Sequence, residues 1–277
     1  MRTALTIAGS DSIAGAGIQA DLKTFAAFGV YGVSALTAAT AQNTEGVTDV
    51  FALSPQMVRA QIDQLAQDVE IAAVKTGMLA TAEIVRVVSE TVGRFRHPNL
   101  VVDPVMAASR PRQGGEPGLA PSRTLLAPDA VSILKARLLP VATVVTPNVA
   151  EAAILSGIRV DSMERAREAA RRISGLGAAA VVIKGGHLGG RDAVDLLFHA
   201  GAFIELAAPR ADYDAIHGTG CTFASAIAAG LALGDDVPAA VQRAKRYITG
   251  AIEHSFAIGH GARILDHFWD GTPPRPV

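Results

Sequence analysis

A glycine-rich segment in the last third of the sequence has the residue types of a phosphate-binding site. Gly218 and Gly220 flank Thr219, and an apolar helix is predicted to begin just after them, at about Thr222. Glycine lets backbone N–H groups come close to a ligand, and the free N–H groups of a first helical turn attract an anion. Because the segment lacks the Lys-Ser/Thr ending of a Walker P-loop, it predicts a phosphate cradle of another type, formed by Gly218, Thr219 and Gly220.

Cys221 follows this cradle and is the single cysteine of the chain. At a helix N-terminus the dipole lowers the pKa of a thiol from its usual value of about 8.5, which favours a thiolate that accepts a proton near neutral pH. The alternative is a small apolar cysteine buried behind a glycine turn. A single cysteine forms no intramolecular disulfide, and the sequence has no Cys/His cluster at zinc-ligand spacing, a pattern typical of a reduced, intracellular protein.

Three further polar residues come directly after apolar runs of strand length, namely Asp103, Asn148 and Lys184. In open α/β sheets, ligands bind beyond the carboxyl ends of the strands, so these side chains are expected at one edge. Asn148 and Glu151 share one face of a first helical turn, and hard oxygen atoms suit Mg²⁺. We predict Glu151 and Asp103 as metal ligands and Asn148 and Lys184 as nucleotide-binding residues. The alternatives are a glutamate favoured by the helix dipole and a solvated lysine on a glycine turn.

Residues 15–20 match the dinucleotide-binding pattern G-x-G-x-x-A, but their context excludes that function. Six residues separate Gly15 from the preceding strand, and no acidic residue ends the second strand. Asp21 instead lies one turn inside the first helix, where it can accept a hydrogen bond from a ligand. Gln42 offers one acceptor and two donors, the complement of the edge of an aminopyrimidine, and Met78 and Val105 can sandwich a flat ring.

Strands and helices must alternate to bring these residues together. Apolar runs of strand length occur at 4–8, 33–39, 71–74, 100–102, 143–146 and 180–183. Segments of helical period occur at 18–28, after Ser54-Pro55, from Asp161, from about Thr222 and after Pro238. This alternation predicts an α/β fold with a mostly parallel sheet covered on both faces. Because no repeat or linker divides the sequence, residues 1–277 are predicted to form one domain.

The composition excludes several classes of partner. With 25 Lys and Arg residues against 26 Asp and Glu residues, the net charge of −1 gives no field that attracts nucleic acid or an anionic membrane. The longest uncharged run, 25–44, approaches the length of a membrane span, but Gly29, Gly32 and several polar residues interrupt it. It is better explained as a helix end followed by a strand. We therefore expect a small-molecule substrate, with neither nucleic acid nor membrane as partner.

Taken together, these motifs resemble those of the hydroxymethylpyrimidine/phosphomethylpyrimidine kinases of thiamine biosynthesis, in the ribokinase-like superfamily. The resemblance covers nearly the whole chain and is carried by residues 9–11, 15–23, 41–44, 75–78, 102–106, 146–148, 184–188 and 217–222. It implies a single-domain ribokinase-like three-layer sandwich and a cytoplasmic homodimer. It also implies transfer of the terminal phosphoryl group of ATP, with Mg²⁺, to the hydroxymethyl group of the pyrimidine and then to its monophosphate.

The resemblance also assigns roles to individual residues. It implies that Gln42, Asp21, Gly9, Met78 and Val105 hold the pyrimidine, and that Cys221 is the catalytic base, where most relatives in the superfamily have aspartate. The cradle from Gly218 to Gly220, with Lys184, neutralises charge on the transferred phosphoryl group.

Three segments depart from the family pattern. Residues 12–15 contain Ile13 and Ala14 where glycines are usual, residues 108–111 lack the usual lid lysine, and Ala215-Ile216 replaces Asn-Thr. The loop 107–122, rich in proline and glycine, is either a lid or a surface insertion.

Three other functions compete with this interpretation. A pyridoxal or pyridoxine kinase of the same superfamily is the nearest. A non-catalytic pyrimidine-binding protein is disfavoured by the phosphate-binding residues, and a nicotinamide dehydrogenase by the failed dinucleotide pattern.

Overall fold

The computed structural model describes residues 1–94, 99–107, 124–186, 191–211 and 215–271. All but Ala107 of the predicted lid loop 107–122 lies outside these ranges, as do His187 and Leu188. The strands are β1 (Thr3–Asp11), β2 (Tyr31–Gln42), β3 (Val47–Ala52), β4 (Ala73–Thr76), β5 (Asn99–Val102), β6 (Val144–Val145), β7 (Ala180–Ile183), β8 (Asp192–His199), β9 (Ala202–Pro209), β10 (Ile216–His217) and β11 (Arg263–Ile264). The helices are α1 (Gly17–Ala27), α2 (Pro55–Asp68), α3 (Ala82–Val92), α4 (Pro128–Ile133), α5 (Val149–Ser156), α6 (Met163–Ser174), α7 (Thr219–Leu233) and α8 (Val237–Glu253). A π-helical turn η1 (Leu134–Leu138) and a 3-10 turn η2 (Leu139–Val141) extend α4.

The main sheet has the strand order β3-β2-β1-β4-β5-β6-β7-β8-β9 in the described residues. The six strands from β2 to β7 in this order pair in parallel, whereas β3, β8 and β9 are antiparallel to their neighbours. The prediction of a mostly parallel sheet is therefore confirmed. Since parallel strands all point the same way, the ends of β1, β4, β5, β6 and β7 lie along one edge, where the predicted site residues are found.

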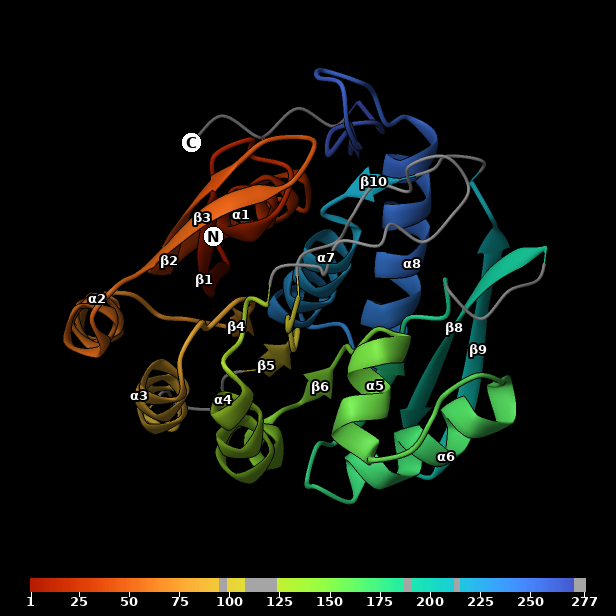
Figure 1. Ribbon diagram of the computed structural model, residues 1–277, viewed down its shortest axis with the longest axis horizontal. Coiled ribbons are helices and arrows are strands. Elements are labelled where there is room, and N and C mark those ends of the chain that lie inside the picture. The colour runs from red at the N-terminus through yellow and green to blue at the C-terminus, as the bar shows by residue number, and fades with distance from the viewer. Residues whose placement is uncertain (95–98, 108–123, 187–190, 212–214, 272–277) are drawn as a thin grey trace.

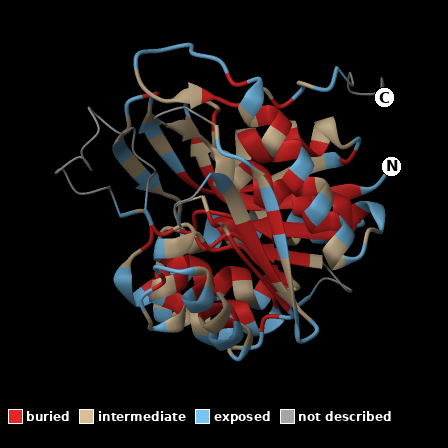
Figure 2. Ribbon diagram, turned by 90° about the vertical axis from the view of Figure 1, so that its right-hand side faces the viewer, coloured by how far each residue is buried: buried red, intermediate tan, exposed pale blue. Residues whose placement is uncertain are grey.

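Helices cover both faces of the sheet, so the fold has three layers. One apolar cluster joins the sheet to α2 through α6, and a second joins its other face to α1, α7 and α8. Figure 1 shows these two groups of helices on opposite sides of the strands. Buried residues concentrate in the central strands and on the helix faces toward them (Figure 2). No described helix is both long and apolar enough to cross a membrane.

Local sequence signals explain where the helices begin. Ser54 caps α2 by accepting a hydrogen bond from the Met57 N–H, and Pro55 occupies the first turn, as predicted. Helix α6 was expected to open at Asp161, but Ser162 is its N-cap. Helix α7 begins three residues before the predicted Thr222, directly after Gly218, whose φ of 84° a residue with a side chain rarely adopts. Residues 25–44 form the end of α1 and β2, as predicted.

The sequence patterns did not predict the antiparallel strands. In β3 half of the residues are exposed, so no apolar run marks this edge strand. Strands β8 and β9 form a hairpin closed by Ala200 and Gly201, with φ of 49° and 79°. Two consecutive positive φ values are typical of a type I′ turn, which usually has Asn-Gly or Asp-Gly. With alanine in the first position, the usual sequence signal of this turn is absent.

Candidate active site

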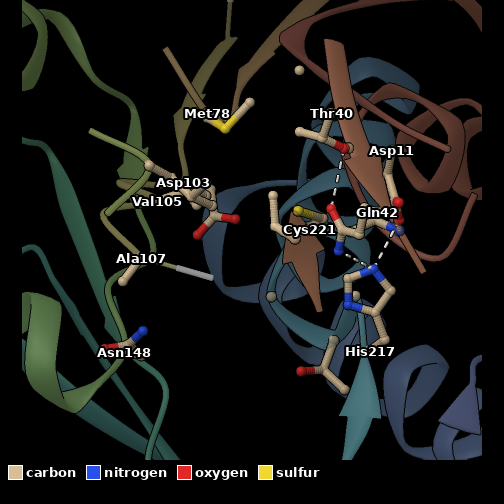
Figure 3. Close-up of a pocket in the computed structure, with 18 of the residues that line it drawn as sticks. Asp11, Thr40, Gln42, Met78, Asp103, Val105, Ala107, Asn148, His217 and Cys221 are labelled. Atoms are coloured by element: carbon tan, nitrogen blue, oxygen red, sulfur yellow. Dashed lines mark hydrogen bonds and ion pairs between the residues drawn. The ribbon is translucent and has the colours of Figure 1, made fainter. Parts of the chain in front are cut away.

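A pocket opens at the carboxyl ends of the parallel strands. It contains about 780 Å³ of space that no protein atom fills, including the part open to solvent. Its walls contain all but one of the predicted site residues: Gly9, Gln42, Met78, Asp103, Val105, Asn148, Glu151, Lys184, Gly218, Thr219, Gly220 and Cys221. In Figure 3, Thr40, Gln42, Asp11 and His217 face Asp103, Val105, Ala107 and Asn148 across the pocket, with Cys221 between the two groups.

The N-terminus of α7 forms the floor of the pocket. The Thr222 N–H is the donor to the Gly218 carbonyl, so the N–H groups of Thr219, Gly220 and Cys221 precede the first intrahelical bond of this turn. Glycine is required at position 218, where a Cβ would lie 1.7 Å from the carbonyl oxygen of Gly15 and φ is 84°. A Cβ on Gly220 would lie 3.1 Å from Lys184 Nζ, a tight contact that the lysine side chain could relieve by a small shift. The geometry thus fits the predicted anion cradle.

Lys184 places a positive charge beside this cradle. Its Nζ lies 2.8 Å from Asp103 Oδ1, which also accepts a hydrogen bond from the Thr146 hydroxyl. Burial alone would lower the pKa of Lys184, but the negative charges of Asp103 and Glu151 outweigh this effect and raise the pKa. The side chain is therefore a cation that is partly neutralised from one side and open to the pocket on the other.

Glu151 is part of a capping box at the start of α5. The Glu151 carboxylate accepts a hydrogen bond from the Asn148 N–H at 2.8 Å, and the Asn148 side chain accepts one from the Glu151 N–H at 2.9 Å. Burial raises the pKa of Glu151 to about 7, with a further increase from Asp103 and an opposing effect from Lys184. Glu151 therefore stabilises the start of α5, as the alternative explanation expected, and it also lies on the pocket wall.

The donor chemistry at this point is compatible with Mg²⁺. The carboxylates of Asp103 and Glu151 lie close enough for the charge of one to raise the pKa of the other, a repulsion that a divalent cation would relieve. Within the described ranges no group of three or more His, Cys, Asp or Glu side chains could hold a metal ion. A cation bound here would rely on water and phosphate oxygens for its remaining ligands, which is how Mg²⁺ is usually bound.

The prediction of a lowered pKa for Cys221 was wrong. Burial raises the pKa of the thiol to about 11, and the positive charge of Lys75 and the Gly17 N–H only partly offset it. The sequence argument included the helix dipole but could not include desolvation, which requires the packed structure. At neutral pH Cys221 is therefore a protonated thiol inside the pocket.

The prediction that Asp21 contacts a ligand directly is also corrected. Its side chain is fully buried, and both carboxylate oxygens lie 2.9 Å from Lys75 Nζ. The hydroxyls of Thr6 and Ser225 donate to the same carboxylate, each at 2.6 Å. Asp21 thus lies in the protein interior near Cys221, outside the pocket wall, and its charge is balanced by a lysine that the sequence analysis left without a role.

The residues predicted to bind the ring combine apolar atoms with one amide. A Cβ on Gly9 would lie 2.3 Å from Met78 Cε, so the glycine allows the Met78 side chain to lie against β1. Gln42 Nε2 lies 3.0 Å from His217 Nε2, which in turn lies 2.8 Å from Asp11 Oδ2. Burial alone would raise the pKa of Asp11, but His217 and the N–H groups of Ala16 and Ile13 outweigh this effect and lower the pKa.

Several pocket residues were not assigned by sequence reasoning. They are Ser10, Asp11, Ala16, Gly17, Thr40, Val47, Ala107, Leu125 and His217. Asp11 and His217 belong to the segments 9–11 and 217–222 that carry the family resemblance. Because both are polar residues at the end of a strand, the sequence could have indicated them as site residues. Val47 and Leu125 belong to segments without any such signal.

Comparison with known proteins identifies the relatives of this chain. A family model described as phosphomethylpyrimidine kinase matches residues 11–266. A hydroxymethylpyrimidine/phosphomethylpyrimidine kinase of Streptomyces coelicolor is 49% identical over 265 residues, covering 96% of this chain and 94% of the relative. A thiamine biosynthesis bifunctional protein of Geobacter sulfurreducens is 48% identical over 95% of this chain, which spans only 51% of that longer protein.

Solved structures of two kinases are similar to this chain. The chain is similar to pyridoxal kinase of Bacillus subtilis in complex with ADP, with a TM-score of 0.87, 38% identity and coverage of 98% and 99% of the two chains. It is also similar to phosphomethylpyrimidine kinase of Clostridium difficile, with a TM-score of 0.76, 40% identity and coverage of 91% and 100%.

Proposed function

Because the chain belongs to the phosphomethylpyrimidine kinase family, we propose that it phosphorylates 4-amino-5-hydroxymethyl-2-methylpyrimidine and then its monophosphate, with ATP as the phosphoryl donor. The observation that carries this proposal is a pocket that combines two kinds of lining. Gln42 faces Val105 across the pocket, and together with Met78 these residues suit a flat polar ring, whereas Lys184 and the α7 N-terminus suit phosphate.

Phosphoryl transfer needs positioning and charge stabilisation more than covalent participation by the protein. The N–H groups at the start of α7 and the Lys184 ammonium meet these needs, because they are fixed before the substrate binds. Asp103 and Glu151 are the residues we propose to hold Mg²⁺, which when bound would neutralise charge on the phosphate oxygens.

Cys221 is the proposed acceptor of the proton from the substrate hydroxyl. A neutral thiol cannot accept a proton, so the form that acts is the thiolate, which forms when Cys221 Sγ gives its own proton to solvent water before the phosphoryl transfer. The Lys75 ammonium and the Gly17 N–H stabilise the thiolate, which favours this step. In a dissociative transfer the hydroxyl proton leaves late, so a base with a high pKa is compatible with the reaction.

A pyridoxal kinase is the second candidate, and the structural similarity to the Bacillus subtilis enzyme favours it. A cradle, a lysine and a thiol in the same pocket argue against a protein that only binds pyrimidine. That residues 1–277 form one domain, and that the enzyme is a cytoplasmic homodimer, remain predictions.

The decisive experiment is an ATP-consumption assay with the pyrimidine, its monophosphate and pyridoxal in parallel. We expect turnover of the first two at a higher kcat/KM than that of pyridoxal. Turnover of pyridoxal alone would establish the second candidate, and no turnover of any of the three would refute the proposed kinase activity.

A further inference from the structure

Four side chains along one wall of the pocket are linked in a row (Figure 3). Asp11 Oδ2 lies 2.8 Å from His217 Nε2, and His217 Nε2 lies 3.0 Å from Gln42 Nε2. At the other end of the amide, Gln42 Oε1 lies 3.2 Å from Thr40 Oγ1. The proposed ring-reading residue is therefore in contact with the protein at both ends of its amide.

The first proton in this row is fixed by Asp11. Its carboxylate accepts hydrogen bonds from the N–H groups of Ile13, Gly15 and Ala16, at 3.1, 3.0 and 2.8 Å. An ionised carboxylate only accepts, and its lowered pKa agrees with ionisation. His217 Nε2 must therefore carry the hydrogen that it shares with Asp11.

That assignment conflicts with an amide whose NH₂ group points at His217. A protonated imidazole nitrogen cannot accept, yet it faces the NH₂ group of Gln42 at 3.0 Å. At the other end of the amide there is no hydrogen to spare. Thr40 has one hydroxyl hydrogen, but its oxygen lies within reach of two acceptors, the Ser10 carbonyl at 3.0 Å and Gln42 Oε1 at 3.2 Å.

We infer that the Gln42 amide is turned by 180°, and that His217 is the positioning residue that fixes it in this orientation. Gln42 Oε1 then accepts from His217 Nε2–H, which it shares with Asp11. Gln42 Nε2–H donates to Thr40 Oγ1, whose own hydrogen is free to bond to the Ser10 carbonyl. The rotation removes the contact between two donors at His217, and the one hydrogen that serves two acceptors is then that of His217 Nε2 and no longer that of Thr40. One N–H and one lone pair of the amide stay available for a ligand.

A fixed amide distinguishes between rings, an inference that rests on the proposed function. In the aminopyrimidine, the carbon next to the hydroxymethyl-bearing carbon carries an amino group, a donor, and beyond it lies a ring nitrogen, an acceptor. Pyridoxal carries an aldehyde, an acceptor, at the corresponding carbon. An amide held in one orientation can pair its C=O with the amino group of the pyrimidine and its N–H with the ring nitrogen. The same amide would place its C=O against the aldehyde oxygen of pyridoxal, so that two acceptors meet. An amide that turns freely could adapt to both rings.

The kinetic test compares two substitutions of His217. His217→Gln keeps an N–H donor, and His217→Leu removes it while filling similar space. For His217→Leu we expect the pyrimidine-to-pyridoxal ratio of kcat/KM to fall about tenfold, mainly through KM for the pyrimidine, as expected for one lost hydrogen bond. His217→Gln should restore the ratio to within about threefold. His199→Ala, at the end of β8, is the control for loss of a histidine elsewhere.

A spectroscopic measurement on the unaltered protein keeps the test valid if a variant is damaged. This matters because His217 packs against Gly15, where a Cβ would lie 2.4 Å from the imidazole. In ¹⁵N-histidine NMR, with the signal assigned from its loss in His217→Gln, we expect a proton on Nε2. An unprotonated Nε2 would overturn the inference, as would an unchanged substrate ratio in a His217→Leu variant that still binds ADP. If the protein phosphorylated neither ring, the proposed function would fail, while the NMR result would still decide the orientation of Gln42.

Discussion

Replacing Lys75 with methionine tests whether the buried pair with Asp21 supports the fold beneath the pocket. Methionine occupies much of the same space but removes the ammonium that lies 2.9 Å from the Asp21 carboxylate. The carboxylate would keep its hydrogen bonds from Thr6 and Ser225 but would remain charged in a fully buried position.

The structure indicates the size of the effect. Both side chains of this pair are 0% exposed, and loss of one partner of such a pair typically costs about 3–5 kcal/mol. The surface pair of Arg59 and Glu90, with side chains 31% and 47% exposed, is the matched control, and its loss should cost less than about 1 kcal/mol. At roughly 2–4 °C per kcal/mol, Lys75→Met should lower Tm by about 6–20 °C.

Urea unfolding, followed by circular dichroism and by the fluorescence of the single tryptophan, Trp269, measures both variants. We expect Lys75→Met to lower the free energy of unfolding far more than Arg59→Met. Adding Asp21→Asn to Lys75→Met should recover part of the loss, because no buried charge then remains. Equal losses for Lys75→Met and Arg59→Met, or no recovery in the double variant, would refute the reasoning.

Three other substitutions test the site. Cys221→Ala should lower kcat by about 10²–10⁴ at unchanged Tm, and near-normal turnover of both pyrimidines would remove Cys221 as the base. In the unaltered protein, with the pKa of Cys221 at about 11, alkylation of the thiol should keep accelerating toward that pH. Glu151→Gln should raise the Mg²⁺ concentration needed for half-maximal rate, and an unchanged metal titration would leave Glu151 a helix cap alone. Because the pKa of Glu151 rises from 4.5 to about 7 on folding, this residue's contribution to the free energy of unfolding is fully present below pH 4.5 and is lost as the pH rises to about 7. In urea unfolding measured across this pH range, Glu151→Gln should lack the decline. Gln42→Leu should weaken pyrimidine binding by a factor of about 10–150 in calorimetry with ADP binding intact, whereas equal weakening of both ligands would indicate a damaged scaffold.

The parallel part of the fold was predictable because it depends on local patterns. Residues 180–183 were predicted as a strand and form β7 with the same bounds, since a short apolar run is typical of a strand buried on both faces. The hairpin of β8 and β9 depends on the backbone of Ala200 and Gly201, which the sequence does not reveal. For the site, residue type and position at a strand end singled out Lys184 and Gln42, and both line the pocket. The partner of Asp21 and the pKa of Cys221 depend on contacts between residues far apart in the sequence, so they required the structure.

The helix that carries the phosphate cradle also determines when the protein can fold during synthesis. Residues 222–232 of α7 are all buried, and Phe223 and Ile227 pack in the same cluster as Val101 and Val144 of the sheet. The part of this sheet face that α1 does not cover therefore stays uncovered until the ribosome has made α7 and α8, although the strands from β1 to β7 are complete by residue 183. At about 5–20 residues per second, the nascent chain exposes this apolar face for several seconds. During that time the exposed apolar face is prone to aggregate, and the C-terminal helices end this exposure when they pack against it.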